Sequence, residues 1–180
     1  RWWLAGGFGA LASLSYSTGF LFAGVAAVEA VLAWRREEAI RNRLAPWVVP
    51  VLAIAGLLAV FVIHQAATGR WNAFFLVQKK YGHGVANPVV TWWTSIAQPW
   101  TEWEVHKRWA GLQSMLVTLV VAVTAWVGVR LREDALVRVS AVAVLAWWCF
   151  PLVMGQGVAL FRAEVMLLPA VFVVSRASLW

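Results

Sequence analysis

Two long stretches of the chain are apolar and carry no charge except at their ends, and this feature constrains the fold most. They cover residues 44–64 and 109–129. A helix that crosses the roughly 30 Å hydrocarbon core of a bilayer needs about 20 mostly apolar residues. Both stretches reach that length. We therefore expect an all-α fold, in the form of a polytopic transmembrane helix bundle.

The composition excludes the common soluble classes. Hydrophobic residues make up 62% of the 180 residues and charged residues only 13%. Soluble domains carry about 25% charged residues. One Cys excludes a disulfide framework or a Cys-based zinc site, and a single Asp excludes an Asp-x-Asp pair that would hold a metal on a nucleotide diphosphate. We expect no metal and no cofactor.

Three further segments are apolar but less regular. Residues 139–161 are interrupted by Pro151 and by the turn signal at 155–157, and residues 165–180 are short. Residues 2–33 contain the polar run Ser15-Tyr16-Ser17-Thr18-Gly19, so they form either one long helix or two short ones. The sequence thus predicts five or six membrane segments in one transmembrane domain, 1–180. Because the chain starts at Arg1 rather than Met, we expect it to be a fragment whose partner is the rest of the same polypeptide.

The basic residues indicate an orientation. Residues 34–43 contain four Arg and residues 130–138 contain three. One span out and one span back separate them, and basic loops favour the cytoplasmic side. We therefore expect a multi-pass protein of a bacterial plasma membrane or the endoplasmic reticulum, with the loop 65–108 outside the cytoplasm.

This outer loop combines aromatic and basic residues. With the first residue after it, it contains six of the fourteen Trp: Trp71, Trp92, Trp93, Trp100, Trp103 and Trp109. Indole rings favour the headgroup level of a bilayer. One interpretation is therefore one or two amphipathic helices lying on the membrane surface. The other is a site for a lipid phosphate or a sugar.

Several residues are candidates for such a site. Lys79 and Lys80 precede a Gly-x-Gly turn and could bind a phosphate, with Gln78, Tyr81 and His83 in support. Arg162 and Glu164 are expected at the same membrane edge. Two further pairs, Glu102 with His106 and Glu104 with Arg108, have the i,i+4 spacing of an exposed helical face.

Short motifs resemble those of the PIG-V type mannosyltransferases, which are polytopic glycosyltransferases of the GT-C class. They are the run at 12–19, the run Thr-Gly-Arg-Trp-Asn-Ala-Phe-Phe at 68–75 with Gln78 and Tyr81-Gly82, Phe161-Arg162, and Leu-Leu-Pro-Ala at 167–170. Tyr16 stands where the family often has Arg, and Arg70-Trp71 replaces its Asp-Pro.

The resemblance implies transfer of a sugar, with mannose expected, from a polyprenyl-phosphate donor to an acceptor on the outer or lumenal face. The family's base is an Asp in an early outer loop. This chain has only Asp134, which we place on the cytoplasmic side, so the base is expected upstream of Arg1 and no catalytic residue is assigned here. The chain would then be the carrier-binding half, with Lys79, Lys80 and Arg162 at the donor phosphate.

Two other classes remain open. Pro46, Pro50, Pro151 and Gly155 could mark broken helices of a transporter or channel. A non-catalytic membrane scaffold subunit would also suit Trp-rich helices. Nucleic acid is not expected as a partner, because the cations flank apolar spans instead of forming one soluble face. Membrane lipid is an expected partner in every case.

Overall fold

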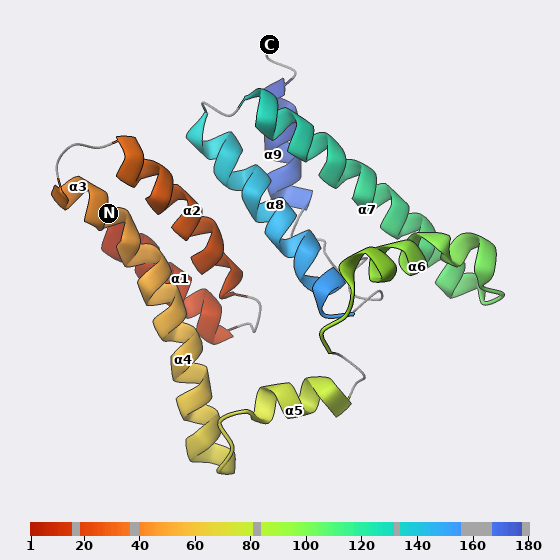
Figure 1. Ribbon diagram of the computed structural model, residues 1–180, viewed down its shortest axis with the longest axis horizontal. Coiled ribbons are helices and arrows are strands. Elements are labelled where there is room, and N and C mark those ends of the chain that lie inside the picture. Colours follow the sequence, from red (N-terminus) through yellow and green to blue (C-terminus); the bar gives the residue numbers. More distant parts are fainter. Residues whose placement is uncertain (16–18, 37–39, 81–83, 132–133, 156–166, 178–180) are drawn as a thin grey trace. The chain divides into compact units, whose positions relative to one another are not determined.

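The chain is helical throughout the residues that its computed structural model describes (Figure 1). These residues are 1–15, 19–36, 40–80, 84–131, 134–155 and 167–177. Within them there are helices, turns and bends and no strand, which confirms the predicted all-α class. The chain forms two compact units, Arg1–Tyr81 and Gly82–Trp180.

The first unit is built around its longest helix. Its elements are α1 (Trp2–Ser15), α2 (Leu21–Arg36), α3 (Ile40–Leu44), η1 (Ala45–Trp47), α4 (Val48–Thr68) and α5 (Ala73–Lys80). Both α1 and α2 pack against α4, and the end of α2 also meets η1. The stretch 2–33 therefore contains two helices, α1 and most of α2, rather than one.

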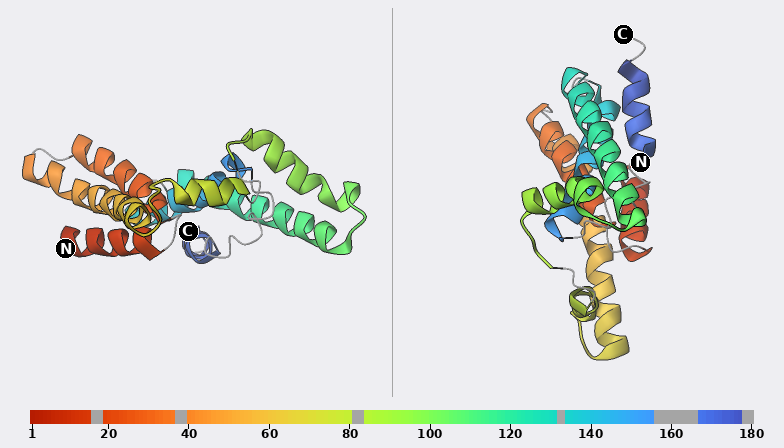
Figure 2. Two further views of the ribbon diagram at one scale, coloured as in Figure 1. Left: turned by 90° about the horizontal axis from the view of Figure 1, so that it is seen from below. Right: turned by 90° about the vertical axis from the view of Figure 1, so that its right-hand side faces the viewer.

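Small residues let α1 approach α4 closely. The buried positions are Gly6, Gly9 and Ser13 on α1, and Pro50, Ala53 and Gly56 on α4. A Cβ atom on Gly9 would lie 3.3 Å from the Cβ of Ala53, and one on Gly56 would overlap the backbone of Ala10, 2.9 Å from its Cα. Membrane helices associate through small residues of this kind, because lipid provides no hydrophobic force between them. The order of these contacts also shows that α1 and α4 run in the same direction, as Figure 2 illustrates.

Local signals explain where α4 begins and ends. Pro46 lies in the preceding 3-10 turn, and Pro50 is the third residue of the helix, where the missing N–H has no partner to lose. Gly69 adopts the left-handed conformation (φ 69°), and its N–H donates to the Gln65 carbonyl at 2.9 Å. The helix therefore runs past residue 64, the predicted end of this span.

The described residues of the second unit contain the helices α6 (Pro88–Thr101), α7 (Val105–Arg130), α8 (Ala135–Val153) and α9 (Leu167–Ala177). The helices α7 and α8 form an antiparallel pair, in which Gly128 faces Ala141, and α9 packs against both. The core consists of two clusters of small and β-branched residues: Val127, Val137, Ala141 and Val173, and Val121, Val144 and Ala170. The single Asp caps α8, because Asp134 Oδ1 accepts from the N–H groups of Leu136 (2.9 Å) and Val137 (3.3 Å).

Three helix ends in this unit differ from the ends of the predicted membrane segments. Helix α7 begins at Val105, four residues before the expected 109, because the backbone is extended at Glu104 and becomes helical after it. Helix α8 begins at Ala135 and ends at Val153 instead of spanning 139–161, because Gly155 takes a left-handed φ of 65°. The described part of α9, Leu167–Ala177, lies inside the predicted segment 165–180, which stays a prediction. Residues 156–166 and 178–180 lie outside the described residues.

Among the described residues, three helical stretches are long and apolar enough to cross a membrane, namely Asn42–Thr68, Val105–Arg130 and Ala135–Val153. Their length and composition are consistent with a membrane protein. The other long described helices have 14 (α1), 16 (α2), 14 (α6) and 11 (α9) residues, which at about 1.5 Å per residue is less than a full crossing. The total of five or six membrane segments stays a prediction.

The distribution of side chains is the reverse of that in a soluble domain. The buried polar side chains are small: Ser13, Thr91, Ser95, Ser114 and Thr124. On α7, large apolar side chains such as Leu116, Leu119 and Trp126 are about 60% exposed. Soluble monomers rarely expose contiguous apolar surface of this kind. An apolar surrounding outside the helices accounts for both halves of the pattern.

The close contact between α1 and α4 generates a test. Replacing Gly56 by Ala forces a shift of the Ala10 backbone, and overpacking of this kind costs about 1–3 kcal/mol of unfolding free energy. Gly24 on α2 has open space around its Cβ position, so Gly24→Ala should stabilise the chain by up to about 1 kcal/mol through helix propensity. Denaturant unfolding in detergent micelles, followed by circular dichroism, compares the two. Equal effects of both substitutions would contradict this packing.

Candidate functional site

The predicted phosphate-binding lysines lie on α5, a short helix held at the end of α4. The ring of Phe61 on α4 contacts both Trp71 and Phe75. The ring centroids are 6.1 Å apart for Phe61 and Trp71, at an edge-on angle of 81°, and 5.9 Å apart for Phe61 and Phe75. Aromatic pairs of this geometry contribute beyond simple burial. The sequence analysis did not single out Phe61, because it lies within an apolar run that predicts only a membrane-spanning helix.

Lys79 and Lys80 are the last two residues of α5, and both side chains are exposed. Their position at a helix C-terminus is favourable, because the carbonyl end of the helix carries partial negative charge. Neither lysine has an ion-pair partner among the described residues. Both ammonium groups are therefore available to an anion from solvent.

The other predicted members of this site cannot be placed beside them. Tyr81, His83, Arg162 and Glu164 lie outside the described residues, as does the side chain of Gln78. The combination of Lys79 and Lys80 with Arg162 at one phosphate therefore stays a prediction.

Within the first unit, α5 lies at the end of α4, and an Arg cluster (Arg1, Arg35 and Arg43) lies near its beginning. One pocket is lined by Trp2 of α1, Ala33 of α2, and Asn42, Ala45 and Pro46, so these segments meet at the beginning of α4. Arg1, Arg35 and Arg43 belong to the same end by their neighbouring positions in the chain. The 21 residues of α4 then carry the chain about 31 Å to α5.

In the second unit, α6 begins beside the end of α8 and runs along the first half of α7. Its start is fixed by the Ala86 N–H, which donates to the Val153 carbonyl at 2.8 Å. Farther along, Trp92 Nε1 donates to Thr118 Oγ1 at 3.2 Å, and Gly111 of α7 lies against Pro99. The polar and small residues of α6 thus face inward. Trp93 and Trp100 are exposed, by 62% and 72%.

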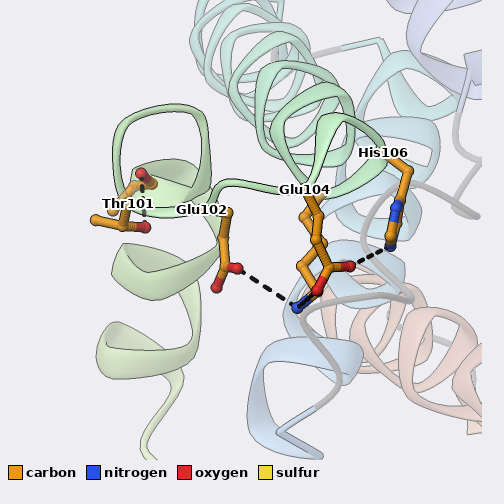
Figure 3. A network of polar contacts seen from close by, with 6 residues as sticks. Thr101, Glu102, Glu104 and His106 are labelled. Atoms are coloured by element: carbon orange, nitrogen blue, oxygen red, sulfur yellow. Dashed lines mark hydrogen bonds and ion pairs between the residues drawn. The ribbon is translucent and has the colours of Figure 1, made fainter.

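A second polar cluster occupies the junction between α6 and α7 (Figure 3). Lys107 Nζ lies 3.1 Å from Glu104 Oε1 and 3.4 Å from Glu102 Oε2, and His106 Nε2 lies 3.2 Å from Glu104 Oε2. The predicted i,i+4 pairs of Glu102 with His106 and of Glu104 with Arg108 were wrong. Glu102 and Glu104 are the caps of two different helices, and their backbones are extended.

This junction has the features of an ion-paired surface turn. The side chains of His106 and Glu104 are 77% and 54% exposed, and the Lys107 ammonium pairs with both carboxylates. Arg108 is held differently, because its Nε donates to the Pro99 carbonyl at 3.1 Å. Among the described residues, no group of three or more His, Cys, Asp or Glu could hold a metal ion.

Comparisons with protein-family models, with curated proteins and with solved structures find no match to the chain. The resemblance to the PIG-V type mannosyltransferases therefore stays a prediction that rests on the motifs at 12–19, 68–75, 161–162 and 167–170.

The attachment of α5 to α4 is testable through Phe61. Phe61→Ala removes two aromatic contacts worth about 0.5–1.5 kcal/mol each, so amide hydrogen exchange in α5 should accelerate about tenfold. Hydrogen-exchange mass spectrometry measures this. Phe8→Ala is the matched control, because Phe8 is exposed on α1 and makes no described ring contact. Unchanged exchange in α5 would show that Phe61 does not hold it.

Proposed function

We propose that this chain is the carrier-binding part of a multi-pass membrane glycosyltransferase. It would help to transfer a sugar, with mannose as our expectation, from a polyprenyl-phosphate donor to an acceptor on the extracytoplasmic face. The observation that carries the proposal is the pair of exposed lysines, Lys79 and Lys80, which α5 holds at the end of a membrane-length helix. The family resemblance suggests the role of this pair, which is to bind the phosphate of the donor.

The proposed chemistry needs positive charge where the leaving group forms. When the acceptor hydroxyl attacks the anomeric carbon, the bond to the lipid phosphate breaks and the phosphate departs with added negative charge. Two ammonium groups that face this phosphate stabilise the charge as it develops. We propose Arg162 as a third cation, Gln78, Tyr81, His83 and Glu164 as supporting groups, and a base upstream of Arg1 that takes the hydroxyl proton.

The prenyl chain of the donor needs an apolar surface close to the lysines. Trp71 and Phe75 are about half exposed. Trp71 lies in the connection between α4 and α5, and Phe75 lies on α5, one turn before Lys79. Polyprenyl chains are apolar, so their burial against such rings is favourable. A donor could therefore keep its chain in the bilayer and its phosphate at the end of α5.

The proposal places the Arg-rich ends of both units in the cytoplasm and the helices α5 and α6 outside. Opposite ends of α4 carry the Arg cluster and α5, and opposite ends of α7 carry Arg130 and the Glu102–Arg108 junction. Since basic loops favour the cytoplasm, this orientation follows the positive-inside rule.

Cysteine labelling of intact cells tests this orientation. In a Cys149→Ala background, Arg70→Cys and Trp103→Cys should react with a membrane-impermeant maleimide, whereas Asn42→Cys and Arg130→Cys should react only after permeabilisation. Trp103 is 96% exposed, so its replacement should not disturb packing. Labelling of the second pair without permeabilisation would reverse the orientation.

Binding of a polyprenyl phosphate tests the lysine site. For the full-length protein in nanodiscs, Lys79→Ala and Lys80→Ala should each weaken binding about tenfold, because each removes a charge-assisted hydrogen bond. Arg162→Ala is expected to act in the same way. Binding of the matching polyprenol, which lacks the phosphate, should not change.

Lys107→Ala is the matched control for these variants. It removes the same side chain and charge, but Lys107 is already paired with Glu102 and Glu104. Its effect on polyprenyl-phosphate binding should therefore be small. Equal binding by wild type, Lys79→Ala and Lys80→Ala would refute the phosphate role.

A further inference from the structure

A pocket at the Arg-rich end of the first unit has no role in the proposed sugar transfer. It has a volume of about 410 Å³, within the range of about 300–1,000 Å³ typical of small-molecule sites. Its lining residues come from the end of α2 and from the segment that leads into α4. They are Val31, Trp34, Arg35, Leu44 and Trp47.

The lining divides into an apolar part and a charged part. Val31, Leu44 and the two Trp rings provide the apolar surface, and among the described lining residues Arg35 provides the cation. Arg35 is exposed and has no hydrogen-bond or ion-pair partner among the described residues. Nearby, the guanidinium of Arg43 lies over the Trp34 ring, 5.9 Å from its centroid. The ring is thus supported from the next segment of the chain.

We propose that this pocket binds an anionic phospholipid of the cytoplasmic leaflet, with an acyl chain against Val31, Leu44 and the Trp rings and the phosphate at Arg35. Two observations select this occupant over a soluble anion. The lining is almost entirely apolar, and Trp with Arg is the combination found at the headgroup level of a bilayer. A free phosphate would use Arg35 and leave the apolar surface unoccupied.

This inference rests on the membrane placement proposed above but not on sugar transfer. The pocket lies at the opposite end of α4 from Lys79 and Lys80. A failure of polyprenyl-phosphate binding at the lysines therefore leaves the lipid site standing, and a failure of the lipid site leaves the lysine site standing.

Native mass spectrometry of the purified full chain in detergent tests the proposal. The probes are phosphatidylglycerol and phosphatidylcholine with identical acyl chains. The wild type should bind phosphatidylglycerol more tightly. Arg35→Gln should weaken phosphatidylglycerol binding about tenfold, because it removes one charge-assisted contact to the phosphate. It should weaken phosphatidylcholine binding less, because the choline cation already offsets the charge of that phosphate. Inorganic phosphate at the same concentrations should not compete.

Arg1→Gln is the matched control, because it removes one Arg at the same end of the first unit but outside the pocket. It should bind both lipids as the wild type does. A second variant, Val31→Phe, fills the pocket without a change of charge and should weaken binding of both lipids, while its circular dichroism melting curve reports folding. Wild-type phosphatidylglycerol binding by Arg35→Gln, or an equal loss in Arg1→Gln, would overturn the proposal.

Discussion

The close approach of α1 to α4 is the contact on which the first unit depends. Only Gly and Ala at positions 6, 9, 53 and 56 allow the two backbones to come so near. The contact matters because α1 is too short to cross a bilayer alone, at about 21 Å for its 14 residues. In the structure α1 packs along α4, which belongs to a helical stretch of full membrane length. Arg43 lies on α3, shortly before the beginning of α4, and α5 follows the end of α4.

The helices of the second unit also pack closely through small residues. Gly111 faces Pro99, Gly128 faces Ala141, and the hydroxyls of Ser95, Ser114 and Thr124 donate to carbonyls of their own helices. Because these hydroxyls are satisfied within their own helices, they need no partner on another helix, and neighbouring helices can approach closely. Large apolar side chains are then left on the outside. In water this arrangement would cost free energy, whereas in lipid it costs little.

Features that follow from local composition could be predicted from the sequence, and features that depend on backbone geometry could not. Apolar length identified the spans, since the stretch 44–64 lies inside Asn42–Thr68, and the polar run at 15–19 marked the break before α2. The junction at Glu102 and Glu104 was misjudged because only φ and ψ reveal that the helix stops there. At the candidate site, adjacent lysines were visible in the sequence. Their attachment through Phe61 was not, because an aromatic residue inside a span gives no signal of a specific partner.

The central claim is that the outward apolar surface of these helices contacts lipid, and electron paramagnetic resonance on α7 tests it most directly. Nitroxide labels would be placed singly at Leu112, Leu116, Leu119, Val123 and Trp126, all exposed, in vesicles and in a Cys149→Ala background. Collision with oxygen, relative to a water-soluble nickel complex, should rise from Leu112 to a maximum near Leu119 and fall again at Trp126. Dominant collision with the nickel complex at Leu116 and Leu119 would show that this face contacts water and would contradict the account.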